Sequence, residues 1–194
     1  MRMTAGLYQA FFGNSEIKER VIISPILYPK RLVPGIAEER TLLNYTIGTA
    51  HDSTFIKCAI GPSHIGDLTL MLKKTPCRKA ILLGTIGSLK KQLKIGKVFL
   101  ASSAVDGEGF SSWLIKEKLR YAYKPSPALL KKAKEKLPLA LSGSILTVGS
   151  LLAEGSKHIK GFDGLDMESS AFFAAAERSG IDAVGIYVIS DQPS

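Results

Sequence analysis

Short apolar segments that alternate with helical segments are the feature that most restricts the fold of this chain. Segments 79–83 and 183–189 are almost entirely apolar, and unbroken apolar runs of this length are typical of strands buried on both faces. Segment 168–179, just before the second run, has the length of a helix and is followed by Gly180, a frequent helix stop. The pattern predicts an α/β fold with three layers, in which helices cover both faces of a mixed, mostly parallel central sheet.

The other expected elements follow the same alternation. We expect further strands at 20–27, 54–60, 97–102 and 140–148, and further helices within 1–14 and at 65–74 and 126–137. Gly84 is expected to end the strand at 79–83. The 194 residues show no internal repeat and no break in composition. The sequence therefore predicts one domain over residues 1–194.

Composition limits where such a chain can act. Its apolar runs are far shorter than the roughly 20 residues of a membrane helix, and residues 1–14 lack the hydrophobic region and cleavage site of a signal peptide. We therefore expect no membrane partner. Cys58 and Cys77 lie in or beside apolar segments without metal-type spacing. This favours buried free thiols over a disulfide or a reactive site, and indicates a reducing, cytoplasmic compartment.

The net charge of +9 allows nucleic acid, an acidic membrane or an anionic small molecule as a partner. The lysines form separated pairs, at 73–74, 90–91 and 131–132, and are not interleaved with aromatic residues as in a single-strand-binding face. Solvated helix faces and turns are the preferred interpretation, and steering of an anionic substrate is the next. We expect no nucleic-acid partner, whose binding would weaken steeply with added salt.

Polar residues follow several apolar strands, at the carboxyl ends where α/β sheets bind ligands. In segment 81–88 (ILLGTIGS), two glycines predict a tight turn whose free N–H groups suit an anion or ribose oxygens; a plain strand-to-loop turn is the alternative. Segment 147–152 follows another expected strand. Ser190 and Asp191 follow strand 183–189. A carboxyl in an apolar mouth there would have a raised pKa, and a helix cap or turn is the alternative.

Segment 165–169 (LDMES) opens the predicted helix at 168–179. Acidic residues in a first turn favour the helix dipole, which is one interpretation of this carboxylate. The other is that it accepts two hydrogen bonds from the 2′,3′-diol of a ribose, with Met167 as a soft apolar floor for the sugar.

These segments together resemble the nucleoside phosphorylase family, which includes the methylthioadenosine/S-adenosylhomocysteine nucleosidases. The shared order is a Gly-x-x-Gly segment after a central strand, the stretch 93–98 (LKIGKV), a Met-Glu pair at 167–168 and a Ser-Asp pair at 190–191. The resemblance covers about 54–191. It implies a phosphorylase-like fold and cleavage of the N-glycosidic bond of a purine nucleoside, by phosphorolysis or by hydrolysis.

The resemblance assigns roles to the two acidic pairs. Asp191 would donate a proton to the departing base, and Ser190 would help to hold it. Glu168 would hold the ribose hydroxyls, while Met167 would lie against the sugar. Protonation of the base relieves the negative charge that develops on it, and nearby anions stabilise the positive charge on the sugar.

The same resemblance implies contacts with the base and the nucleophile. Thr85 would contact the nucleophile or the ribose, and Gly87 would lie close to the base. Leu151 or Leu152 would take the place of an aromatic residue that sandwiches the base in the family. A Gly-x-x-His motif of another branch is matched by the segment that ends at His64, which could contact phosphate; a helix N-terminal residue is the alternative.

No metal or organic cofactor is implied, although inorganic phosphate would be the co-substrate of a phosphorylase. We expect a homo-oligomer, because related sites borrow residues from a neighbouring subunit. Leu82 occupies the position of a phosphate-binding Arg in one branch, and no motif matches the water-activating Glu of the nucleosidases. The choice of nucleophile therefore stays open. The alternative function is a non-catalytic nucleoside- or nucleotide-binding protein that retains the fold.

The sequence as printed ends three residues after Asp191. Family members usually continue from this position into a helix that closes the site. We therefore expect the Asp191 carboxyl to be exposed.

Overall fold

The fold is described by a computed structural model that covers residues 5–114, 122–150 and 161–192. The helices of this part are α1 (Ala5–Phe12), α2 (Pro29–Leu32), α3 (Pro62–Leu72), α4 (Phe110–Leu114), α5 (Pro127–Lys136) and α6 (Ser169–Ser179). The strands are β1 (Arg20–Ser24), β2 (Glu38–Arg40), β3 (Thr46–Ala50), β4 (Ser53–Lys57), β5 (Lys79–Ser88), β6 (Val98–Gly107), β7 (Ala122–Tyr123), β8 (Leu141–Val148), β9 (Gly164–Asp166) and β10 (Asp182–Asp191).

All these strands belong to one sheet, which closes partly on itself. Strand β5 pairs with β1, β9 and β10, and β10 also pairs with β6, which leads back through β8 and β9 to β5. These five strands form a barrel-like ring, from which β1, β4, β3 and β2 extend as an open wing. The α/β class and the mixed central sheet are therefore confirmed, but the closure differs from the plain three-layer arrangement expected from the sequence.

The sheet is mixed, as expected, and its longest ladders, β5–β10 and β6–β8, are parallel. Strands β4, β1, β5 and β10 are mutually parallel neighbours, and β6, β8 and β9 continue in parallel. The pairs β10–β6, β5–β9, β6–β7, β3–β4 and β2–β3 are antiparallel. The antiparallel pairs arise where the ring closes and where short strands join its edges, and neither event leaves a signal in apolar periodicity.

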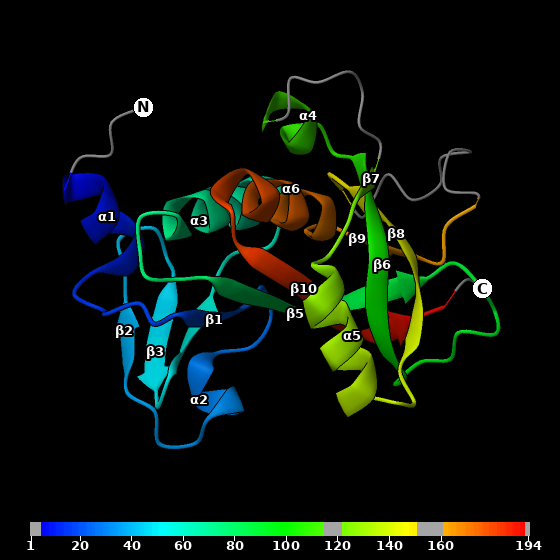
Figure 1. Ribbon diagram of the computed structural model, residues 1–194, viewed down its shortest axis with the longest axis horizontal. Coiled ribbons are helices and arrows are strands. Elements are labelled where there is room, and N and C mark those ends of the chain that lie inside the picture. The colour runs from blue at the N-terminus through cyan, green and yellow to red at the C-terminus, as the bar shows by residue number, and fades with distance from the viewer. Residues whose placement is uncertain (1–4, 115–121, 151–160, 193–194) are drawn as a thin grey trace.

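Helices cover both faces of the sheet, as expected (Figure 1). Helices α3 and α6 pack on each other on one side, and α5 lies on the other side against β6 and β10. Helix α6 is the most enclosed helix, since every residue from Ser169 to Ala176 is buried. Its small alanines allow α3 and the sheet to approach closely, while Phe172 and Phe173 fill the core between them. The first turn of α6 is thereby fixed against the sheet.

Most expected elements are present within a few residues of their predicted bounds, but Gly84 does not end β5. The strand continues to Ser88 because β10 pairs with it along its whole length, with Tyr187 opposite Gly84. A Cβ at Gly84 would lie 3.2 Å from Cδ1 of Tyr187, so glycine accommodates the ring. The sequence analysis missed β2, β3, β7 and β9, which are short or lack apolar runs.

The two cysteines and the lengths of the helices bear on expectations drawn from the composition. Cys58 and Cys77 are both buried and free, as predicted. None of the helices in the described ranges has the length and apolar character needed to cross a membrane.

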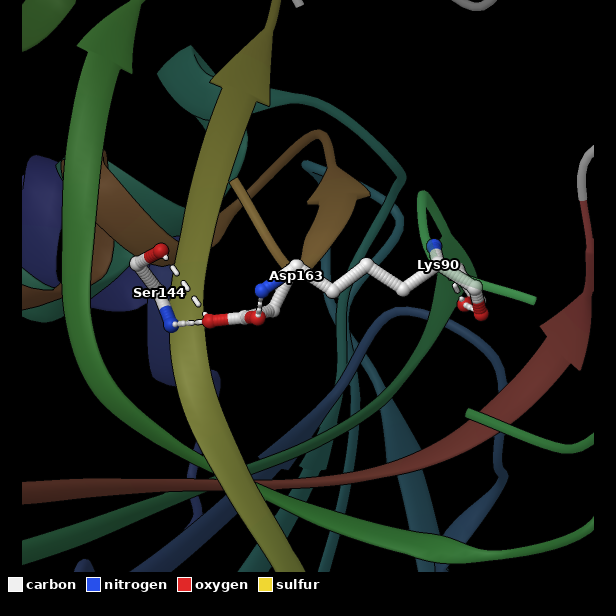
Figure 2. Close-up of polar contacts among 4 residues, drawn as sticks. Lys90, Ser144 and Asp163 are labelled. Carbon is white, nitrogen blue, oxygen red and sulfur yellow. Dashed lines mark hydrogen bonds and ion pairs between the residues drawn. The ribbon is translucent and has the colours of Figure 1, made fainter. Parts of the chain in front are cut away.

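A polar cluster fastens the loop after β5 to β8. The ammonium of Lys90 pairs with the carboxylate of Asp163, whose Oδ2 also accepts the backbone N–H of Ser144 at 2.7 Å. Figure 2 shows Asp163 lying between Lys90 and Ser144. Burial alone would raise the pKa of Asp163, but the bonds from Lys90 and Ser144 have the larger effect in the opposite direction. The pKa of Asp163 therefore lies below its ordinary value. The cluster holds the chain just before β9, which leads into the candidate site.

Candidate active site

A cavity of about 160 Å³ opens where β5 and β10 end and where the chain leaves β1. Its described lining combines three carboxyl-bearing residues with apolar and hydroxyl groups: Pro25, Ile26, Ile60, Thr85, Gly87, Leu165, Asp166, Met167, Glu168, Ser190 and Asp191. The position agrees with the rule that α/β sheets bind ligands beyond the carboxyl ends of their strands. Six residues singled out in the sequence, from three separate segments, line this one cavity.

Asp191 and Ser190 form one wall at the last rungs of β10. The Oγ of Ser190 lies 2.6 Å from Oδ1 of Asp191 and 3.2 Å from the carbonyl oxygen of Ile86. Asp191 is exposed, as expected from the sequence, and is not enclosed in an apolar mouth. The ladder between β10 and β5 shifts register between Ile189 and Asp191, which turns this pair toward the cavity edge.

Gly87 lies directly beneath the Asp191 carboxylate. A Cβ at Gly87 would lie 2.7 Å from Oδ2 of Asp191, so any side chain there would displace the carboxylate. Segment 84–88 is not the tight turn predicted from its two glycines. Its residues are extended and pair with β10 on one side, while Gly87 and Ser88 pair with β9. Its backbone therefore serves the sheet, and the exposed side chain of Thr85 is what it offers a ligand.

Glu168 and Met167 line the cavity from the start of α6. Glu168 is the N-cap residue of that helix and is 7% exposed. Its Oε1 accepts the backbone N–H of Gly61, the N-cap of α3, at 2.7 Å. Gly61 has φ +116°, a conformation that favours glycine. Both helix starts therefore meet at this carboxylate, and Met167 lies beside it in the cavity wall.

Burial first, and then the charge of nearby Asp166, raise the pKa of Glu168 to about 7, against the backbone hydrogen bonds from Gly61 and Met167. A carboxyl with this pKa exchanges its proton near neutral pH, which is frequent at functional sites. When ionised, such a carboxylate can accept hydrogen bonds from a diol.

The structure does not bring every candidate residue into this cavity. His64 lies in the first turn of α3, is exposed and does not line it. Leu151 and Leu152 lie outside the described residues. Leu82 is fully buried in the core. The phosphate contact of His64 stays a prediction.

Several lining residues were missed in the sequence analysis. Pro25, Ile26 and Ile60 follow β1 and β4, and no polar signature marks them. Asp166 was part of the segment 165–169 but received no role. Pro25 and Ile60 fall inside the strands expected at 20–27 and 54–60, and only the shorter observed β1 and β4 place them beyond strand ends.

The chemistry available in the described cavity is that of carboxyl and hydroxyl groups. No group of three or more His, Cys, Asp or Glu side chains suited to a metal ion occurs in the described ranges. The Lys, Arg and His side chains of these ranges are also missing from the lining. Two carboxyl groups from different elements, Asp191 on β10 and Glu168 at the start of α6, line one cavity and can act on two parts of one ligand.

Comparison with known proteins agrees with this fold. A sequence profile described as the Phosphorylase superfamily matches residues 27–194. The chain therefore belongs to the phosphorylase superfamily, which confirms the resemblance drawn from the motifs. A DeoD-type purine nucleoside phosphorylase from Alkaliphilus metalliredigens is 30% identical over 128 residues, which cover 59% of this chain. The match spans 52% of that relative, so the chain corresponds to about half of its length.

Solved structures share the fold at low sequence identity. AMP nucleosidase from Bacteroides thetaiotaomicron has a TM-score of 0.80 and 20% identity, over 90% of this chain and 81% of that protein. Purine nucleoside phosphorylase from Toxoplasma gondii has a TM-score of 0.75 and 24% identity, over 92% and 79% of the two chains. Nucleosidases and phosphorylases are thus both similar to this chain.

Proposed function

We propose that this protein cleaves the N-glycosidic bond of a nucleoside, with a purine as the departing base. The observation that carries the proposal is that Glu168, at the start of α6, and Asp191, at the end of β10, line the same cavity together with Met167, Thr85 and Gly87. A nucleoside has two ends that need different chemistry, a ribose diol and a base. The two carboxyl groups can serve these ends separately.

In the proposed reaction Asp191 donates a proton to the base as the bond breaks. Ser190 holds the carboxyl through the 2.6 Å contact between Oγ and Oδ1. Glu168 in its ionised form accepts the ribose hydroxyls and stabilises the positive charge on the sugar. Gly61 fixes the other oxygen of Glu168, which orients the carboxylate toward the cavity.

The nucleophile is water or inorganic phosphate, and no metal or organic cofactor takes part. Three carboxyl groups and no cation line the described cavity. Because bound phosphate needs compensating positive charge, this lining favours water as the nucleophile in a single chain. Phosphorolysis would need cations from outside this lining. A neighbouring subunit of a homo-oligomer is one source.

The proposed working unit is one phosphorylase-like domain over residues 1–194 that assembles with itself. A single core cluster that reaches from Phe11 to Ile189 supports one domain. Large apolar side chains exposed at the cavity edge, Ile26 and Ile60 among them, support self-association. The two free buried thiols are consistent with the cytoplasm, and the proposed ligand is a small nucleoside rather than nucleic acid.

The test is chromatographic analysis of products from inosine, adenosine, guanosine, methylthioadenosine, AMP and uridine, each with and without phosphate. Free base without phosphate would show hydrolysis, and free base only with phosphate would show phosphorolysis. Asp191→Asn should lower either rate by about 10²-fold or more, as expected for loss of a general acid. Asp182→Asn, at the exposed start of β10, is the matched control. Binding without release of any base would establish the non-catalytic alternative.

A further inference from the structure

Asp166 is a buried carboxyl that the proposed mechanism does not use. It ends β9, two residues before Glu168, and is 5% exposed. No ion pair among the described residues includes it. A buried carboxylate without a cation is costly unless several hydrogen bonds satisfy its oxygens. The partners of Asp166 therefore indicate what its position serves.

Both oxygens of Asp166 accept hydrogen bonds within a buried network. Oδ1 accepts the hydroxyl of Thr147 at 2.7 Å, across the β8–β9 pair. Oδ2 accepts the backbone N–H of Ser169 at 2.8 Å and also the Ser169 hydroxyl. The phenol oxygen of Tyr187 lies 2.5 Å from Oγ of Ser169 and extends the network to β10.

The network satisfies the first turn of α6, whose N–H groups have no partners inside the helix. Asp166 accepts the N–H of Ser169 and is also hydrogen-bonded by the backbone of Glu168. Thr147 accepts the N–H of Ser170 at 2.9 Å while it donates to Asp166. Asp166 and Thr147 thus fix the backbone at the start of α6, which carries Glu168. Gly61 separately fixes the carboxylate of Glu168.

We propose that Asp166 is a positioning residue for Glu168, which it sets in the cavity through the Thr147–Ser169–Tyr187 network and whose charge state it controls. The inference rests on the proposed function only for the role of Glu168 as the ribose-holding group. The placement of the two carboxyl groups and their network stands independently of any reaction.

Burial is the largest cause of the raised pKa of Glu168, and the charge of Asp166 is the next. Burial raises the pKa of Asp166 to about 6, despite the bonds from Ser169 and Thr147. Burial also raises the pKa of the Cys58 thiol, which faces Glu168 from the end of β4, to about 12, and that of the Tyr187 phenol well above its ordinary value. Both are therefore neutral near pH 7.

Two further carboxyl groups lie near the pair. Glu108 reaches α6 by accepting the hydroxyl of Ser170 at 2.9 Å and is also bonded to Ser111. Asp191 faces the cavity from β10 but is exposed to solvent. Asp166 is the carboxyl that acts directly on the pKa of Glu168. Replacing it with a neutral residue should make Glu168 easier to ionise.

The test is a carboxyl ¹³C NMR titration of the ligand-free protein, in which Glu168→Gln identifies the Glu168 resonance. In Asp166→Asn the Glu168 midpoint should move to lower pH, and nucleoside binding should weaken about tenfold as the backbone loosens. Thr147→Val removes one bond to Asp166 without removing its carboxyl. In that variant the Asp166 midpoint should rise and the Glu168 midpoint should fall.

Thr69→Val is the matched control, because Thr69 is also fully buried and its hydroxyl bonds within α3, to the carbonyl of Ile65. It should leave both midpoints unchanged. If Asp166→Asn does not fold, Thr147→Val decides the question. A Glu168 midpoint that stays at the wild-type value in the folded variants overturns the inference. Midpoints that move in a protein that cleaves no nucleoside would refute the proposed function and leave the inference standing.

Discussion

The backbone N–H of Gly61 donates to Oε1 of Glu168 at 2.7 Å, across 107 residues of sequence. This bond joins the starts of α3 and α6 at one carboxylate. The backbone of Met167 also hydrogen-bonds this carboxyl. The site is therefore built on two helix starts, and its properties depend on the charge of Glu168.

The pH dependence of stability should reveal the two buried carboxyls. Asp166 and Glu168 have pKa values of about 6 and about 7 in the folded protein, above their ordinary values of 3.8 and 4.5. Their contribution to the free energy of unfolding is fully present below those ordinary values and is lost as pH rises through 6 and 7. We expect Tm to be lower at pH 8 than at pH 5 by a few degrees, since about 1 kcal/mol shifts Tm by roughly 2–4 °C at this size.

Calorimetry of Glu168→Gln tests this assignment, because the neutral amide has no proton to lose. The decline of Tm between pH 5 and pH 8 should become shallower in that variant. Glu135→Gln, on the exposed face of α5, should retain the wild-type slope. Equal slopes in all three proteins would contradict the assignment.

Substitution of Gly87 should separate folding from activity. In Gly87→Ala the new methyl group would lie 2.7 Å from Oδ2 of Asp191, which forces the carboxylate to move. A displacement near 1 Å at a catalytic group can lower a rate by about 10²-fold. We expect such a loss in nucleoside cleavage with little change in circular dichroism. Gly149→Ala, where a Cβ meets nothing within 4 Å, should behave as wild type; equal activity of the two variants would argue against the contact.

In the cluster of Lys90, Asp163 and Ser144, we expect the hydrogen bond to Ser144 to contribute more to the free energy of unfolding than the ion pair with Lys90. Asp163→Ala removes the acceptor of the Ser144 N–H and should cost about 1–3 kcal/mol of unfolding free energy. Lys90→Ala breaks a partly exposed ion pair and should cost at most about 1 kcal/mol. Denaturant titrations of both, beside Lys91→Ala as control, would rank them. A larger cost for Lys90→Ala would mean that the ion pair dominates.

Self-association through the cavity edge can be tested at Ile60, which is 55% exposed and lines the cavity. Ile60→Glu should shift the protein toward the monomer in sedimentation velocity, because a charge there would have to be desolvated in an interface. Leu139→Glu alters a residue that is 91% exposed at the turn before β8 and should leave the assembly unchanged. An unaltered oligomer in Ile60→Glu would exclude this edge as the interface.

The sequence by itself determined the class of the fold and predicted six of the residues that line the candidate cavity. Apolar runs placed β1, β4, β5, β6, β8 and β10 within a few residues, because burial of a strand on both faces demands such runs. The Met-Glu and Ser-Asp pairs lie at the start of α6 and the end of β10, as local signals of strand ends and helix starts allow. Family membership followed from the same motifs.

Only the tertiary structure decided how these parts meet. Closure of the sheet depends on β10 pairing with both β5 and β6, and such pairing between distant segments leaves no periodic mark in the sequence. It turned the expected glycine turn at 84–88 into strand. It also buried Asp166 against Thr147 and Tyr187, since a carboxyl acquires its pKa and its partners from neighbours that the fold supplies, and residue type alone cannot specify them.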